Sequence, residues 1–157
     1  MGALIAPSEL IQRMRGKRVY FDSAPIIYAL ENNPRYAEIA LQFTDASEKR
    51  DFFGFTGTMA LVELLVKPLQ EQNAALVANI KQLFASGDVF TCLEHPHDTL
   101  MLSAQLRASY RLKMADAIHM ATAIHNRCNF FLTNDSKLSS ISTLEVILLD
   151  DLIGHRA

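Results

Sequence analysis

Cysteine is scarce in this 157-residue sequence, and long apolar runs are absent from it. The two cysteines, Cys92 and Cys128, are too few for a disulfide scaffold or a four-cysteine zinc site. Two buried thiols in a reducing compartment are the simplest interpretation. No apolar stretch reaches the roughly 18 residues of a membrane span, and residues 1–18 lack the pattern of a signal peptide. We therefore expect a cytoplasmic protein with no membrane segment.

Charge is also in little excess, because the formal net charge is −2 and the isoelectric point is near 6.2. Such a chain has no overall attraction to nucleic acid, so any nucleic-acid binding must come from a local patch or from bound metal cations. The stretch DSAPII after the first strand-like run contains no glycine, which argues against a dinucleotide-binding loop. No linker or internal repeat divides the chain, and half of its residues are apolar, so one domain over residues 1–157 is expected.

Short strand-like runs alternate with helix-like segments along the chain. Strands are expected at residues 18–22, 52–56, 88–93, 130–134 and 145–149. Helices are expected at residues 23–32, 36–49, 59–68, 71–85, 98–111 and 114–127. Strands separated by helices imply parallel pairing, with helices on both faces of the sheet. The expected fold class is a three-layer α/β/α sandwich around a central parallel sheet of about five strands.

Local signals set several of the expected helix ends. Ser23 and Thr58 are the predicted caps of the helices that follow them. Pro68 should break the helix that contains it, because proline has no N–H to donate. Gly87 should end the longer helix before it, because glycine readily adopts the left-handed conformation of a helix terminus.

Two acidic residues stand at the ends of predicted strands. Asp22 ends the first strand, and Asp135 follows the fourth. In open parallel sheets, the functional crevice lies beyond the carboxyl ends of the strands, where the strand order reverses. If the first and fourth strands are neighbours at that reversal, both carboxylates face one crevice.

Two helical acids can join them. Glu63 lies in MALVELLV and Asp116 in MADAIHMATA, each flanked by apolar residues that should pack on the sheet. Four carboxylates in one concave site repel one another unless a cation neutralises them. Mg²⁺ or Mn²⁺ suits such an all-oxygen site, because these ions bind a few carboxylates and keep exchangeable waters.

These segments together resemble a known family. VYFDSAPIIYALE, TGTMALVELL, ADAIHMATA and FLTND, in this order and spacing, resemble the PIN domain, and within it the ribonuclease toxins of the VapC type. The resemblance runs from about residue 19 to residue 149 and leaves residues 1–17 as an N-terminal extension. It implies a metal-dependent endoribonuclease that hydrolyses RNA phosphodiester bonds.

The resemblance also assigns roles to residues and partners. Asp22, Asp116 and Asp135 correspond to the principal metal ligands, and Glu63 to a second-metal ligand or the residue that orients the attacking water. Ser23 and Thr133 correspond to hydroxyl residues that hold the carboxylates in position, although Ser23 as a plain helix cap is an equal alternative. A homodimer and a small antitoxin protein that blocks the crevice are the implied partners.

Other interpretations remain open at this level. Each acid taken alone fits a helix cap or a turn, and only their combination favours a site. A PIN-type RNA-processing nuclease without an antitoxin would keep the same chemistry. A catalytically inactive PIN-like binding module is the alternative of a different class, and failure to bind manganese would support it.

Several residues outside the acidic set carry weaker signals. Cys92, His95 and His97 form a short cluster, but a fourth ligand at zinc-finger spacing is missing and a loop is favoured. His119, three residues after Asp116, could approach the site, but a packing residue is the favoured interpretation. A basic cluster before Asp22 is either a solvated segment or a local contact for RNA phosphates. The residues of this cluster are Arg13, Arg15, Lys17 and Arg18.

Overall fold

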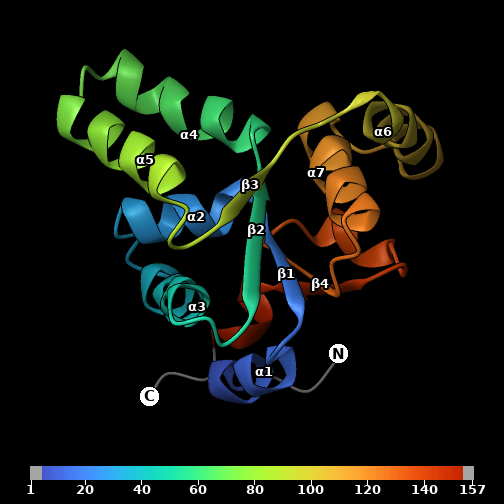
Figure 1. Ribbon diagram of the computed structural model, residues 1–157, viewed down its shortest axis with the longest axis horizontal. Helices are drawn as coiled ribbons and strands as arrows, with labels where there is room; N and C mark the ends of the chain where they lie inside the picture. The colour runs from blue at the N-terminus through green and yellow to red at the C-terminus, as the bar shows by residue number, and fades with distance from the viewer. Residues whose placement is uncertain (1–4, 154–157) are drawn as a thin grey trace.

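A parallel sheet of five strands forms the centre of the molecule (Figure 1). The structure is a computed structural model and describes residues 5–153. The strands are β1 (Arg18–Phe21), β2 (Phe53–Gly57), β3 (Thr91–Leu93), β4 (Phe130–Thr133) and β5 (Glu145–Leu148). They pair in the order β3-β2-β1-β4-β5, and every pair is parallel. The expected sheet, and the expected neighbourhood of the first and fourth strands, are confirmed.

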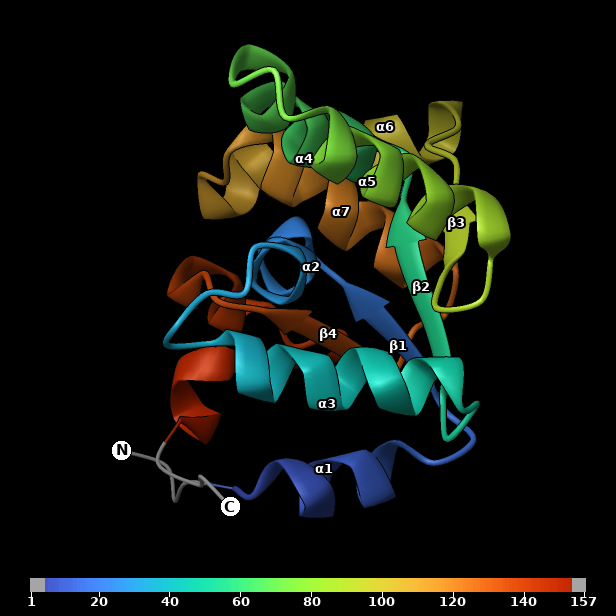
Figure 2. The ribbon, with the colours of Figure 1, turned by 90° about the vertical axis from the view of Figure 1, so that its left-hand side faces the viewer.

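Helices cover both faces of this sheet, which confirms the three-layer fold (Figures 1 and 2). The helices before β3 are α1 (Pro7–Met14), α2 (Ser23–Leu30), α3 (Ala37–Glu48), α4 (Met59–Gln70) and α5 (Ala74–Ser86). Those after it are α6 (His97–Tyr110), α7 (Met114–His125) and the short 3₁₀ helices η1 (Ser136–Ser140) and η2 (Leu149–Leu152). Within residues 5–153, no helix combines the length and apolar character that a membrane span requires.

Alternation along the strands explains the two layers. Val19 and Phe21 of β1 lie in the core cluster that contains buried residues of α1 to α5. Tyr20, between them, lies in the second core cluster, with α6 and α7. Successive side chains of a strand point to opposite faces, so an uninterrupted apolar strand supplies both layers. The sheet is buried on both sides for this reason.

Three expected element boundaries were wrong. Pro68 does not break its helix, because α4 continues to Gln70 and the N–H of Glu71 still donates to the carbonyl of Lys67 at 2.9 Å. The next helix begins at Ala74 instead of at residue 71, after Asn73 caps it by accepting from the N–H of Leu76. The third strand is shorter than expected, because pairing with β2 begins only at Thr91. The predicted end at Gly87 is confirmed by its left-handed φ of 67°.

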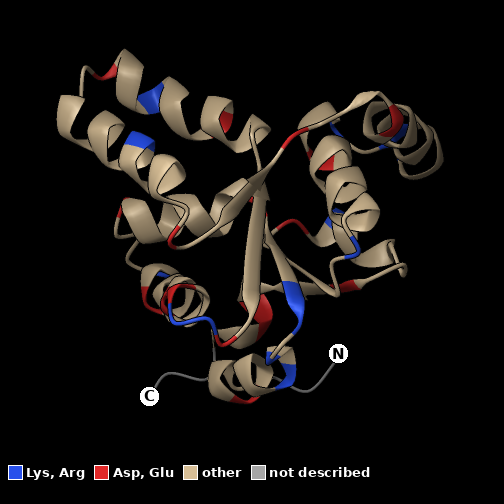
Figure 3. Ribbon diagram, in the orientation of Figure 1, with Lys and Arg blue, Asp and Glu red and all other residues tan. Residues whose placement is uncertain are grey.

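The basic cluster lies at the amino end of β1. Arg13 of α1 donates two hydrogen bonds to the carboxylate of Glu145, at 2.7 and 2.9 Å. Arg18 opens β1, donates to the carbonyl of Asn126 at 2.8 Å and lies over the ring of Phe55. Figure 3 shows these basic positions on α1 and at the start of β1, at the opposite end of the strand from Asp22. The contacts of Arg13 and Arg18 thus serve ion pairing and packing within the fold.

Candidate active site

Two of the predicted acids stand at the carboxyl edge of neighbouring strands. Asp22 follows β1, and its N–H donates to the carbonyl of Leu132 in β4 at 3.0 Å. Asp135 lies two residues after the end of β4 and begins η1. Because β1 and β4 pair in parallel, the two acids come to the same edge although 113 positions separate them.

Asp22 is almost wholly buried and fully hydrogen-bonded. The residue as a whole is 5% exposed, and its Oδ1 accepts from the N–H of Ser23 at 2.8 Å. Its Oδ2 accepts from the hydroxyl of Thr133 at 2.7 Å. Asp22, and not Ser23, is therefore the cap of α2, which corrects the cap assigned from the sequence. Burial raises the pKa of Asp22, while His119 and these two hydrogen bonds oppose the rise.

Glu63 lies on α4, close to Asp22, and its carboxylate contacts Ser23 and His119. The hydroxyl of Ser23 donates to Glu63 Oε2 at 3.1 Å, and His119 contacts Glu63 Oε1 at 2.5 Å. The Nε2 atom of His119 also lies 3.9 Å from Asp22 Oδ1. One ligand atom from each of these three residues, Asp22, Glu63 and His119, lies within 4.8 Å of the others.

Asp116 and Asp135 complete the group. Asp116 lies in the first turn of α7, and its pKa is raised to about 6, with burial as the largest cause. The negative charge of Asp22, the neighbouring carboxyl group of Asp135 and the charge of Glu63 contribute to the same rise. The N–H of Asp135 in turn donates to the hydroxyl of Thr133 at 3.2 Å. The four acids thus share one electrostatic environment.

The comparison with protein families identifies the family of this chain. The family model for the PIN domain matches residues 19–144. This chain belongs to the PIN domain family. The match runs from β1 to the loop before β5 and includes all four acids of the site.

Solved structures with the same fold include several toxin and antitoxin assemblies. A toxin-antitoxin complex from Klebsiella pneumoniae superimposes with a TM-score of 0.65, at 19% identity over 83% of this chain and 97% of that chain. VapBC2 from Rickettsia felis, bound to a promoter DNA fragment, gives 0.63 at 14% identity over 83% and 98%. DNA-bound VapBC from Salmonella typhimurium gives 0.63 at 15% identity over 85% and 98%. A comparison with curated protein sequences gave no match.

The contact between His119 and Glu63 in this PIN domain was not predicted from the sequence. His119 is fully buried, as expected of a packing residue, but both of its ring nitrogens have polar partners. Burial by itself lowers the pKa of His119, yet the hydrogen bond to Glu63 and the charge of Asp22 raise it overall. Its position three residues after Asp116 on α7 was the only signal, and spacing alone does not reveal a partner on α4.

Within residues 5–153, the cluster of Cys92, His95 and His97 does not form a group of converging metal ligands. His95 accepts from the N–H of Met59 at 3.0 Å and contacts Thr122 at 2.6 Å, so both of its ring nitrogens are used inside the protein. Burial lowers the pKa of His95 and favours its neutral form. Asn134 accepts from the N–H of Asp150 at 3.0 Å and so connects the end of β4 to η2.

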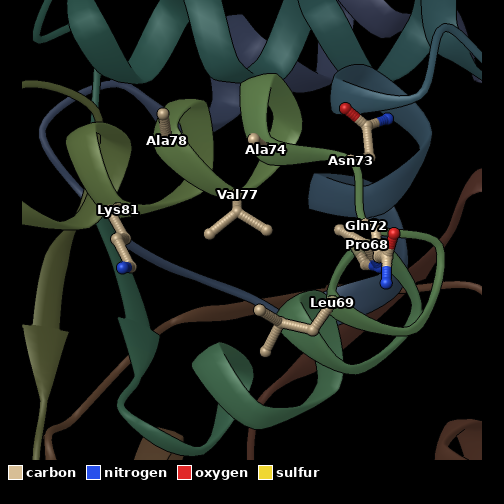
Figure 4. Close-up of a pocket in the computed structure, with 8 residues that line it drawn as sticks. All are labelled: Pro68, Leu69, Gln72, Asn73, Ala74, Val77, Ala78 and Lys81. Carbon is tan, nitrogen blue, oxygen red and sulfur yellow. The ribbon is translucent and has the colours of Figure 1, made fainter.

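A hollow of about 480 Å³ lies away from the acids, between α4 and α5. Leu69 and Val77 point toward each other across it (Figure 4). The lining residues are Pro68, Leu69, Gln72, Asn73, Ala74, Val77, Ala78 and Lys81. This lining contains one titratable side chain and none of the four acids, so the hollow is not the centre of the acid chemistry.

The donor set of the acidic site fits a divalent cation of the oxygen-binding class. Asp22 and Glu63 offer carboxylate oxygens a few ångströms apart, and Asp116 lies close enough to Asp22, Asp135 and Glu63 for their charges to raise its pKa. Burial, and then the negative charges of its acidic neighbours, raise the pKa of Asp116, and a bound cation would offset these charges. Mg²⁺ and Mn²⁺ prefer such carboxylate ligands. The possible holders of the ion are Asp22, Asp116 and Asp135, with Glu63 beside them.

Proposed function

We propose that this PIN domain is a metal-dependent endoribonuclease and the toxin of a type II toxin and antitoxin pair. The observation that carries the proposal is the convergence of four carboxylates, from β1, α4, α7 and the end of β4, on one edge of the sheet. Membership of the PIN family supports nuclease chemistry for such a site. Mg²⁺ or Mn²⁺ is the proposed cofactor.

The four acids have distinct proposed roles. Asp22, Asp116 and Asp135 hold the cation, and Thr133 and the N–H of Ser23 keep the carboxylate of Asp22 in one orientation. The bound cation would supply Lewis-acid stabilisation of the phosphate charge and acidify a water. Glu63 orients that water or accepts its proton, since its carboxylate is anchored by Ser23 rather than free to rotate.

The substrate we propose is single-stranded or looped RNA. A site built from four carboxylates offers little to hold the two phosphate backbones of a duplex, so unstacked nucleotides suit it better. The basic cluster at the start of β1 lies at the other end of the sheet, so it does not supply phosphate contacts at this edge. The choice among RNA sequences therefore depends on the surfaces around the four acids.

The partners we propose are an antitoxin protein and a second copy of this chain. The neighbours in fold that are described as toxin-antitoxin complexes support the antitoxin. Exposed apolar side chains on α4, at Val62 (65%), Val66 (48%) and Leu69 (59%), support a protein contact on this helix. Their spacing of four and three residues places them on one face of α4.

Cleavage of a labelled mixed RNA pool is the primary test. Wild type, Asp22→Asn and the exposed control Asp88→Asn are each assayed with Mn²⁺, with Mg²⁺ and with a chelator. We expect metal-dependent cuts with wild type and Asp88→Asn, and none with Asp22→Asn. Equal cleavage by all three proteins, or cleavage that survives the chelator, would contradict the proposed mechanism. No Mn²⁺ binding by wild type would favour an inactive binding module.

A growth experiment tests the toxin assignment separately. Induced expression in a bacterial host should arrest growth with wild type and leave growth unchanged with Asp116→Asn at equal protein level. Growth arrest that co-expression of a small protein encoded beside this chain relieves supports the antitoxin pair. RNA cleavage in vitro without any growth effect would instead favour an RNA-processing nuclease.

A further inference from the structure

Both carboxylate oxygens of Glu63 contact side chains of buried residues. The hydroxyl of Ser23 reaches Oε2, and Nε2 of His119 reaches Oε1. Nδ1 of His119 lies 2.7 Å from the hydroxyl of Tyr20. A continuous chain therefore runs from Tyr20 on β1, through His119 on α7, to Glu63 on α4.

The direction of the hydrogen bonds follows from the donors and acceptors present. An ionised carboxylate has no proton to donate, so Nε2 of His119 carries the proton in its bond to Glu63, whatever the charge of the ring. Burial raises the pKa of Tyr20 well above its ordinary value, so its hydroxyl keeps its proton. The proton on Nε2 means that this nitrogen is not available to a metal ion in this arrangement.

Packing fixes the plane of the His119 ring. The Tyr20 ring stacks on Phe131, with centroids 5.3 Å apart and an interplanar angle of 7°. It meets His119 edge to face at a centroid distance of 5.7 Å. Both Tyr20 and His119 are fully buried. The imidazole can therefore point at Glu63 in essentially one orientation.

A second histidine ties the same two helices together. The N–H of Met59, at the start of α4, donates to Nε2 of His95, which leaves the proton on Nδ1 of His95. This Nδ1 donates to the hydroxyl of Thr122 on α7, which donates to the carbonyl of Ile118 at 2.7 Å. The amino end of α4, one turn before Glu63, is thereby set against α7.

We propose that His119 is a positioning residue that fixes the carboxylate of Glu63 beside Asp22, and that Tyr20 fixes His119. The proposal rests on the function proposed above, in which Glu63 orients or deprotonates the attacking water. A glutamate side chain on a helix has three rotatable bonds. Displacement of a catalytic carboxylate by about 1 Å can lower the reaction rate about a hundredfold. His119 removes this freedom without touching substrate itself.

Nitrogen NMR tests the proposal without any activity measurement. Long-range proton–nitrogen spectra of the wild-type protein should show His119 Nε2 protonated, and its signal should shift in Glu63→Gln but not in Asp88→Asn. A bare Nε2 in the wild type would overturn the proposal, because that nitrogen would then be free to ligate a metal. Because this experiment needs no RNA, its outcome is independent of whether the wild type proves to be a nuclease.

Kinetics of RNA cleavage provide the second test. His119→Leu should lower kcat by roughly tenfold to a hundredfold with little change in KM. His119→Gln, whose amide can still donate near the position of Nε2, should recover most of the loss, and Tyr20→Phe should fall between wild type and His119→Leu. Recovery by glutamine separates positioning from a general effect on packing, since both substitutions replace the ring.

A double-mutant cycle supplies the decisive control. In a Glu63→Gln background, His119→Leu should cause no further loss of cleavage, because the group that it positions is already absent. Equal losses in both backgrounds would overturn the proposal, as would full activity of His119→Leu. If wild type cleaves no RNA under any metal condition, the proposed function fails, and the NMR result still decides the role of His119.

Discussion

At the scale of single residues, Asp22 serves the fold and the site at one position. Its Oδ1 caps α2 through Ser23, and its Oδ2 is held by Thr133 at the end of the neighbouring strand. The sequence marked the four acids as candidates, because each stands at a strand end or among apolar helix residues, and the structure brings these candidates to one edge of the sheet. The sequence was not sufficient to predict which oxygen each donor meets, since Ser23 and Thr133 stand 110 positions apart.

Asp116 should make the stability of the metal-free protein depend on pH. The folded pKa of Asp116 is about 6, above its ordinary value of 3.8, so between these values the folded protein binds the extra proton. The free energy of unfolding therefore falls as pH rises through this window. Relative to Asp116→Asn, wild type should lose stability on the order of 1 kcal/mol, after allowance for the partial exposure of the carboxyl group.

Urea denaturation with a chelator, from about pH 4 to pH 7, measures this difference. The unfolding free energy of Asp116→Asn minus that of wild type should grow with pH and level off above about pH 6. A constant difference across the range would show that burial and the acidic neighbours do not raise the pKa of Asp116 in the folded protein.

Gly57, the last residue of β2, should not tolerate a β-carbon. A β-carbon built there would overlap Cε1 of His95 and the hydroxyl of Tyr20. Gly57→Ala should therefore lower the free energy of unfolding by about 1–3 kcal/mol, the range for overpacking a filled core. Chemical denaturation checks this value. Stability equal to that of wild type would mean that His95 and Tyr20 can move apart without cost.

At the scale of elements, α4 shows what local sequence can and cannot predict. The apolar residues in MALVELLVKPL correctly predicted a helix, and Thr58 stands at the N-cap position that was predicted for it. Within the described part of the chain, Thr58 makes no capping hydrogen bond, and His95 accepts from Met59 instead. This partner comes from the loop after β3, 36 positions away, and cap preferences describe only adjacent residues.

His95→Leu should loosen the amino end of α4. The substitution removes the acceptor of the Met59 N–H and the donor to Thr122, so we expect a loss of about 1–2 kcal/mol in stability. Hydrogen exchange should quicken at the first amides of α4 before it changes at the carboxyl end. The matched control is Thr58→Ala, which should stay within about 0.5 kcal/mol of wild type. A larger effect of the control would mean that the side chain of Thr58 also stabilises this end of the helix.

At the scale of the whole molecule, the strand order brings the site together. The sequence predicted parallel strands with helices on both faces, because alternating strand and helix patterns have few other solutions. The adjacency of β1 and β4 was a condition of the site hypothesis, and the structure meets it. The contact of His119 with Glu63 could not be predicted, since it depends on how α4 and α7 lie against each other.

A divalent cation should stabilise the whole fold, because its proposed ligands converge only in the folded chain. Free Mn²⁺ at about 100 times its dissociation constant should add about 2.7 kcal/mol to the free energy of unfolding. For a chain of this size, this corresponds to a rise in Tm of roughly 5–10 °C. Calorimetry of wild type, Asp22→Asn and Asp88→Asn provides the measurement. The rise should be absent only in Asp22→Asn, and its absence from all three would argue against the metal site.

The sheet order has a consequence for the synthesis of the protein. The central strand β1 is made early, but its partner β4 and the acid Asp135 lie 109 or more positions later in the chain. A ribosome that has made the first 120 residues therefore carries a chain with Asp22, Glu63 and Asp116 but without the strand that brings the last acid to them. If these acids cut RNA, the growing polypeptide is harmless to the messenger that encodes it until translation is nearly complete.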